Sequence, residues 1–426
     1  MRFVSPVALG LVLAMAGVSL GAAAPAAFAK EKAAQAPKLK LSPEFLPAIM
    51  KVQESLNKKD VEGTKAALAV AEPLIKSNDD KYQYYALMLN LSITANDAAM
   101  QGKALAGMLD TGLVPADQQG QFNLIAANGD LNAKNYDSAI ARAQKALAAG
   151  WDVGQSNVVI AQALWGKAGT KGLSVEPARS LVAQGLASFR AGIDAMKAKG
   201  QAVPAQWYQI AASKAEAAGL PEINDWAQMG FQADPSGENL RTVLRVLQRR
   251  NPTMSNRENL DLLRLMSASG GLAVKYDYTE YAEMAFKAGI FGEVKSAIEA
   301  GRAKGVLTAT DGSDLYSVAS QKIAADRASL ASGEADAARS PTSVAASATA
   351  DAYLGYGNYA KAISLYKLAL TKKGVDANEV NTHMGVALFR SGDMAGASAA
   401  FAQVTGGIRG ELAKYWMAWL KGKATA

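Results

Sequence analysis

The sequence of 426 residues predicts an all-α fold, an α-solenoid in which helical hairpins stack on one another. Apolar residues recur at helical spacing in segments separated by Gly, Asn and Pro turns. A small residue and an aromatic residue repeat together at a fixed distance near the C-terminal end. Ala makes up about a fifth of the chain, which favours helices that approach each other closely. No segment shows the alternation of β-branched residues that would predict a sheet.

Residues 1–29 are predicted to be a signal peptide. Arg2 gives a positive start, residues 7–20 are apolar, and small residues end at Ala29. This is the order that a signal peptidase recognises, and the apolar stretch is short for a membrane-spanning helix. We therefore expect cleavage after Ala29, a location in the periplasm and no transmembrane helix in the mature chain. An uncleaved anchor is the alternative.

The clearest repeats lie in residues 349–426. Ala362 and Ala397 are 35 residues apart, as are Tyr366 and Phe401. A small residue lets the two helices of a hairpin touch, and the aromatic residue one turn later fills the space between hairpins. The pattern predicts a C-terminal pair of hairpins, followed by a helix over residues 411–421 that caps the solenoid.

The second hairpin of this pair resembles the tetratricopeptide repeat (TPR) family. The family pattern places Leu-Gly on the first helix, Gly before the turn, and Tyr, Ala, Phe and Ala on the second helix. Its best match in this chain consists of Met384, Gly385, Gly392, Met394, Ala397, Phe401 and Val404. The chain is also similar to exported bacterial TPR proteins without an assigned activity. The resemblance implies a solenoid whose first helices line a concave groove that binds other proteins.

Residues 40–150 carry looser copies of the same repeat. The second helix of each hairpin is predicted to begin at Val61, Ala98 and Tyr136, which are 37 and 38 residues apart. Residues 151–330 are predicted to form divergent helical hairpins, punctuated by Gly and Pro, in which the period is hard to follow. The Ala/Ser-rich residues 331–348 are predicted to be a flexible linker.

The composition excludes several classes of site. The chain has no Cys and a single His, His383, so it has no thiolate metal site and no site that needs two imidazoles. It contains no Gly-rich phosphate loop of common spacing. We expect no catalytic residues, no cofactor and no metal, and we expect that the protein is not an enzyme. For His383 a general base is less favoured than a hydrogen-bonded or exposed helix histidine.

The first three predicted repeats share a row of polar groups on their first helices. If Val52, Leu89 and Ala127 match the Gly385 position, the resemblance places the next residue and the one four further on in the concave groove. Amides there would bond to a peptide backbone or a glycan, although bonds to neighbouring helices or water are the simpler reading. The predicted partner-binding residues are Gln53, Asn57, Asn90, Thr94, Asn128 and Asn132.

A basic stripe is the second candidate surface. Arg241, Arg245 and Arg249 recur every four residues on a predicted helix. They would contact carboxylates or phosphates of an anionic partner, or form a solvated outer face. The net charge of +7 is mild for this length, and nucleic acid is not an expected partner.

These observations predict an exported TPR solenoid that serves as a protein–protein scaffold or adaptor in the bacterial cell envelope. Its partners would be envelope proteins, bound as a peptide or helix in the groove. The alternative is a carbohydrate-binding or polysaccharide-export module that uses the same groove and an anionic polysaccharide. An envelope enzyme is the third possibility.

Overall fold

The computed structural model describes residues 37–425, and it confirms the predicted all-α solenoid. The predicted signal peptide, residues 1–29, lies outside the described residues. The described chain divides into two compact units. The first extends to Pro204 and includes Ser213–Pro221, and the second contains Ala205–Ala212 and everything from Glu222 onward. Helix α9 (Gln206–Ala217) is shared between them.

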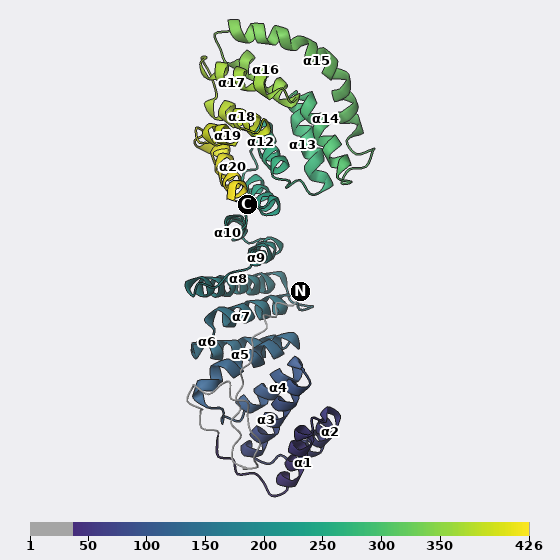
Figure 1. Ribbon diagram of the computed structural model, residues 1–426, viewed down its shortest axis with the longest axis vertical. Helices are drawn as coiled ribbons and strands as arrows, with labels where there is room; N and C mark the ends of the chain where they lie inside the picture. The colour runs from purple at the N-terminus through teal and green to yellow at the C-terminus, as the bar shows by residue number, and fades with distance from the viewer. Residues whose placement is uncertain (1–36, 426) are drawn as a thin grey trace. The chain divides into compact units, whose positions relative to one another are not determined.

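The first unit contains four hairpins and a short 3₁₀ turn, Glu72–Leu74, between the first two (Figure 1). Each helix packs mainly on its neighbours in sequence, α1 also packs on α3, and α5 on α7. Small residues are buried between the packed helices, as Ala139, Ala143 and Ala146 of α6 are fully buried. The helices are α1 (Phe45–Asn57), α2 (Val61–Ala71), α3 (Asn78–Thr94), α4 (Ala98–Leu109), α5 (Ala116–Asn132), α6 (Tyr136–Ala148), α7 (Val153–Ala168) and α8 (Val175–Ala198).

The second unit continues the same hairpin architecture. Ala362, Ala397, Tyr366 and Phe401, the landmarks of the predicted repeat, are all fully buried. The helices are α10 (Ile223–Ala233), α11 (Gly237–Arg250), α12 (Asn256–Ala268), α13 (Lys275–Lys287), α14 (Phe291–Ala303), α15 (Ser313–Arg339), α16 (Val344–Gly355), α17 (Tyr359–Leu370), α18 (Ala377–Arg390), α19 (Met394–Phe401) and α20 (Gly407–Thr425).

Six hairpins share one turn, and this turn makes the repeat visible in the backbone. A residue with positive φ follows the end of the first helix, and the next residue is the N-cap of the second helix. The amides of the two residues bond back into the last turn of the first helix, as Asn96 does to Ile93 and Asp97 to Ser92. The residues with positive φ are Lys59, Asn96, Lys134, Gly289, Gly357 and Gly392.

Gly385 shows why the best-matched repeat needs glycine on its first helix. A Cβ atom at this position would lie 2.5 Å from Cε1 of Phe401. The Phe401 ring stacks in turn on Trp416 of α20, with centroids 4.9 Å apart and planes inclined by 13°. The missing side chain therefore lets α18, α19 and α20 pack around one aromatic stack.

The prediction of a flexible linker at residues 331–348 is wrong, because most of these residues lie in two helices. Residues 331–339 complete α15, which has 27 residues, and α16 begins at Val344. In Figure 1 α15 arches from α14 to α16. Ala is the strongest helix former, so an Ala-rich stretch supports a helix wherever neighbouring helices bury part of it. Only the short Ser340–Ser343 segment separates the two helices.

The domain boundaries also differ from those predicted from sequence. The predicted middle region, residues 151–330, is divided between the two units, because α7 and α8 continue the first unit whereas α10 to α14 belong to the second. The hairpins pack on their immediate neighbours even where the sequence period fades. The core of the first unit therefore continues past residue 150.

The last helix closes the second unit on itself. α20 packs on α18 and α19, and it also packs on α12, near the start of the unit. Tyr415 of α20 meets Phe231 of α10 edge-on, with ring centroids 5.7 Å apart. One continuous core runs from Ala227 to Leu420. The predicted helix over residues 411–421 thus lies within α20, which covers an earlier part of its own unit.

Candidate functional site

The predicted amide row lies on the first helices of the first three hairpins. Gln53 and Asn57 are on α1, Asn90 and Thr94 on α3, and Asn128 and Asn132 on α5; each pair occupies the fifth-last and last positions of its helix. All six residues are partly or fully exposed. The structure therefore places the predicted residues at equivalent, accessible positions of successive hairpins.

Four of the six side chains, those of Gln53, Asn57, Thr94 and Asn128, use part of their bonding capacity inside the chain. Gln53 Nε2 donates to Asn57 Oδ1 at 3.0 Å, and Asn128 Nδ2 donates to the Leu124 carbonyl at 2.9 Å. The Thr94 hydroxyl donates to the Asn90 carbonyl. Within residues 37–425, the side-chain amide of Asn90 has no hydrogen-bond partner, nor does that of Asn132. The unused capacity of this surface therefore includes the amides of Asn90 and Asn132 and the Asn128 oxygen.

The predicted arginine stripe lies on α11, and two of its members face α13. Arg241 Nε donates to Asp277 at 2.9 Å, and Arg245 binds both Asp277 and Glu280, at 2.5 and 2.6 Å. Burial raises the pKa of Asp277, but its bonds to Arg241, Arg245 and two backbone amides hold it well below its usual range. These arginines neutralise carboxylates of their own chain, so the prediction of an anionic partner loses most of its support. Arg249 is at the end of the same helix.

The most extensive cluster of functional groups was not predicted from sequence. It is an ionic network buried in the second unit, and Arg264 of α12 is its centre. The Arg264 side chain is 0% exposed. Its guanidinium donates to Glu293 at 2.7 Å and to Asp261 at 3.2 Å. Burial lowers the pKa of this group, but the two carboxylates keep it well above the ordinary value, so the charge is retained.

Glu293, in the first turn of α14, connects Arg264 to the end of α18. The Tyr281 hydroxyl donates to Glu293 Oε1 at 2.6 Å, and Arg390 Nη2 donates to the same oxygen at 2.9 Å. Arg390 Nη2 also donates to the Tyr281 oxygen at 3.0 Å. Burial raises the pKa of Glu293, but Arg264 and Arg390 lower it by more, well below its usual range. Glu293 is therefore a fixed negative charge shared by two arginines.

Asp261 makes the corresponding link from α12 to α18 and α20. Arg409 Nε donates to Asp261 Oδ2 at 2.9 Å, and His383 Nε2 lies 2.9 Å from Asp261 Oδ1. Burial raises the pKa of Asp261, whereas His383, Arg264 and Arg409 together lower it to about 2. A single carboxylate thus holds three cationic side chains from three helices.

His383 is held between two carboxylates. Its Nδ1 lies 2.7 Å from Asp351 Oδ1, to which it donates, and Tyr366 donates to the same oxygen at 2.7 Å. Burial lowers the pKa of His383, but Asp351 and Asp261 raise it to about 9. The histidine is thus protonated at neutral pH and both of its ring nitrogens carry hydrogen. The expectation of a hydrogen-bonded helix histidine is confirmed, in a buried and charged form.

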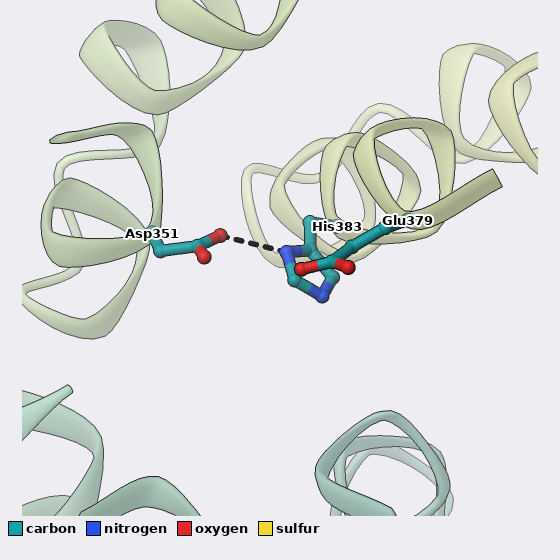
Figure 2. Close-up of side chains that lie close together, drawn as sticks. All are labelled: Asp351, Glu379 and His383. Atoms are coloured by element: carbon teal, nitrogen blue, oxygen red, sulfur yellow. Dashed lines mark hydrogen bonds and ion pairs between the residues drawn. The ribbon is translucent and has the colours of Figure 1, made fainter. Parts of the chain in front are cut away.

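Glu379 extends the network toward solvent, one helical turn before His383 on α18. It forms an ion pair with Arg257 of α12, and its Oε2 lies 3.2 Å from Nη2 of Arg409. Figure 2 shows Asp351, Glu379 and His383 converging, with the Asp351 carboxylate directed at the imidazole. Single ligand atoms of these three residues lie within 4.8 Å of one another, a spacing compatible with a metal ion.

The electrostatics of this trio argue against a metal centre. A metal ligand must be a neutral imidazole, whereas both carboxylates beside His383 favour its proton. Arg257 lies 3.7 Å from Asp351, and Arg409 lies beside Glu379, so the same carboxylates already face guanidinium groups. A divalent cation would have to displace the proton and approach these positive charges. The three residues fit a histidine that keeps its proton, held between carboxylates that also pair with arginines.

A cavity of about 550 Å³ opens beside the network. Its lining includes Tyr281, Glu293 and Arg390 of the network, further residues of α14 and α15, and the α16–α17 turn. The network therefore has two consequences. It ties α12 to α18 and α20, and it fixes the orientation of an arginine at the edge of a cavity.

Sequence reasoning missed this cluster because its partners are far apart along the chain. Arg257 and Glu379 are separated by 122 residues, and Arg390 and Glu293 by 97. A local signal was present: Asp261 and Arg264 interrupt an apolar stretch, and a charged residue on a buried helix face requires a partner. The identity of that partner depends on the closure of the unit, which no local pattern encodes.

Comparisons with known proteins leave the family open. No protein-family model and no curated protein matches the chain. A solved structure described as the human IFIT1 dimer with m7Gppp-AAAA aligns with 15% identity over 88% of this chain and 80% of that chain, with a TM-score of 0.24. This TM-score carries no argument about function. Among the described residues, no helix is both long and apolar enough to cross a membrane. The chain's own helices and turns show an all-α fold of TPR-like helical repeats.

Proposed function

We propose that this protein is an exported member of the TPR family that binds partner proteins in the cell envelope through its first unit. The observation that carries the proposal is the equivalent, accessible placement of Asn90, Asn128 and Asn132 on successive first helices. Each retains side-chain donors or acceptors that no residue of the described chain uses. An export signal in residues 1–29 would place this surface in the periplasm.

Neutral amides suit a peptide or helix partner. Each amide offers both a donor and an acceptor, which matches the alternating N–H and C=O groups of an exposed backbone. Long side chains lose conformational entropy when they bind, whereas asparagine has few rotatable bonds to fix. A row of asparagines therefore recognises a backbone without requiring a charged partner.

An anionic polysaccharide is less well supported. That alternative depended on the stripe of Arg241, Arg245 and Arg249, and two of these arginines neutralise Asp277 and Glu280. A glycan ligand would therefore have to be held mainly by the amide row. Retarded migration of the protein in gels that contain an anionic polysaccharide, with loss of retardation in Arg245→Ala, would restore this alternative.

We also propose that the protein has no catalytic activity of its own. The buried acids Asp261, Asp277, Glu280 and Glu293 of the second unit are paired with arginines, and His383 keeps its proton at neutral pH, so none of them offers a free general base. Purified protein is expected to leave a peptidoglycan preparation unchanged. Release of soluble fragments above the level of a heat-denatured sample would contradict this proposal.

The decisive experiment is cross-linking in the periplasm, followed by purification and identification of the linked proteins. The wild-type chain is expected to yield a reproducible partner. The double variant Asn90→Ala/Asn128→Ala is expected to lose most of it, because the substitutions remove the Asn90 amide and the Asn128 oxygen, which no described residue uses. Gln184→Ala is a matched control, since Gln184 is an exposed amide on α8, outside the row. Equal recovery by the double variant would overturn the proposal.

A further inference from the structure

A second binding site is indicated in the second unit, separate from the amide row of the first. It is the cavity of about 550 Å³ beside the ionic network, lined by parts of α12 to α18. A volume of this size is typical of pockets that enclose a small ligand. The groups that line it come from hairpins well separated in sequence, so the site exists only in the folded unit.

The cavity contains three cationic side chains. Arg390 uses Nη2 for Tyr281 and Glu293, and its Nε and Nη1 have no partner among the described residues. Its side chain is 22% exposed. Arg327 lies over the Tyr356 ring, 4.7 Å from its centroid, and forms no ion pair with any described residue. Lys295 is 3.7 Å from Glu299, a long and exposed pair. The cavity therefore contains N–H hydrogen-bond donors that no described residue uses.

The acceptors of the cavity are already engaged. Glu293 accepts from Arg264, Tyr281 and Arg390. Glu299 accepts from the Tyr316 hydroxyl at 2.9 Å as well as facing Lys295. The Tyr359 hydroxyl at the rim has no hydrogen-bond partner within the described chain. An incoming ligand therefore meets unused N–H and O–H donors, and it needs acceptor atoms of its own.

The charge balance indicates a monoanion. Lys295, Arg327 and Arg390 carry three positive charges, and Glu293 and Glu299 carry two negative ones, which leaves one net positive charge in the lining. A ligand with several negative charges would face repulsion from Glu293, which cannot move away from its two arginines. The apolar side chains of Leu272, Ile323 and Leu354 also line the cavity and would accommodate a hydrocarbon part.

We propose that this cavity binds a single carboxylate attached to an apolar group. Arg390 and Arg327 would bind the carboxylate oxygens through charge-assisted hydrogen bonds, and Tyr359 would donate a further bond. The same chemistry is offered by the C-terminal end of an apolar peptide and by a small aliphatic acid. This site is independent of the proposed partner surface in the first unit.

Titration calorimetry of the full mature chain tests the proposal with three probes: acetyl-Leu-Leu with a free carboxylate, the same peptide as its C-terminal amide, and butyrate. The free acid is expected to bind at least tenfold more tightly than the amide, because only the acid satisfies the unused donors. Tighter binding of the dipeptide acid than of butyrate would identify a peptide end as the ligand, and the reverse order a small acid. Either order supports a carboxylate site.

Matched variants separate the site from general charge effects. Arg327→Gln is expected to weaken binding of the acid at least tenfold, and Tyr359→Phe to weaken it severalfold. Arg339→Gln is the control, because Arg339 is also an exposed arginine of α15 and lies outside the cavity. The proposal is overturned if no probe binds, if acid and amide bind equally, or if Arg339→Gln weakens binding as much as Arg327→Gln. Unchanged unfolding curves would confirm that each variant folds.

Discussion

Arg409 and Asp261 are joined by a hydrogen bond of 2.9 Å across 148 residues of sequence. This bond fastens the last helix of the second unit to one of its first. A solenoid of repeats usually contacts only its neighbours, so a bond of this kind requires the unit to curl back on itself. Asp261, Arg264 and Glu293 at the centre of the network are buried, and each carboxylate is paired with guanidinium groups.

Asp261→Asn is expected to lower the free energy of unfolding of the second unit by about 3–5 kcal/mol. The amide would leave Arg264, Arg409 and the charged His383 without their shared carboxylate, and unpaired buried charges are costly. Urea unfolding followed by circular dichroism measures the effect. Asp336→Asn is a control, because Asp336 is an exposed partner in an ion pair on α15 and should change stability by less than about 1 kcal/mol. Equal effects of the two substitutions would contradict the proposed role of the network.

His383 gives the second unit a stability that depends on pH. The pKa of His383 is raised from 6.5 to about 9, so its contribution is fully present below pH 6.5 and is lost as the pH rises through about 9. The shift corresponds to about 3 kcal/mol. His383→Gln removes the titrating group. The difference in unfolding free energy between wild type and variant should therefore be greatest near pH 6 and should shrink toward pH 10. A difference that stays constant over this range would show that folding does not raise the pKa of His383.

Gly385→Ala is expected to destabilise the protein by about 1–3 kcal/mol, because the added Cβ would overlap the Phe401 ring. The sign of the change in stability distinguishes a packed position from an exposed one. In an exposed helix the same change is favourable by about 0.5–1 kcal/mol, since glycine is the poorer helix former. A shift of the melting temperature to a lower value would support the close packing of α18 on α19. A higher melting temperature would indicate that Phe401 does not occupy this position.

A proline at position 335 distinguishes a helix from a linker. Ala335 is an exposed residue inside α15, so Ala335→Pro would disrupt the helix by about 3 kcal/mol without altering buried contacts. Loss of helical circular dichroism and a lower unfolding midpoint are expected. Ala335→Ser is the matched control and should behave as wild type. If the proline variant is equally stable, residues 331–348 form the flexible segment that their composition first indicated.

The sequence was sufficient to predict the class of fold because each hairpin carries its own signals. Apolar spacing predicts the helices, and turns such as Asn96-Asp97 predict their ends, since a residue with positive φ and a capping side chain are local requirements. Ala362 and Ala397 lie at the close helix contacts that were expected of them. The Ala-rich residues 331–348 were misjudged because composition alone does not separate a helix with few large side chains from a linker.

The candidate sites were predictable only in part, for a related reason. Asn90 and Asn128 lie on the same layer of helices, so a local repeat pattern suffices to find them. Glu293 meets Arg390, and Asp261 meets Arg409, only when the second unit closes, because the two partners are 97 and 148 positions apart. Without that closure the sequence shows charged residues on helices that read equally well as solvated surface.

The central claim is that buried charges hold α12, α18 and α20 together and so close the second unit. Hydrogen–deuterium exchange of the intact chain tests it most directly, with α12, α18 and α20 followed together. In the wild type the backbone amides of these helices should exchange slowly and at similar rates, as one cooperative unit. In Asp261→Asn the exchange of α20 should accelerate together with that of α12, while α3 and α5 in the first unit remain unchanged. Rapid exchange of α20 in the wild type, or unaltered exchange in the variant, would contradict the claim.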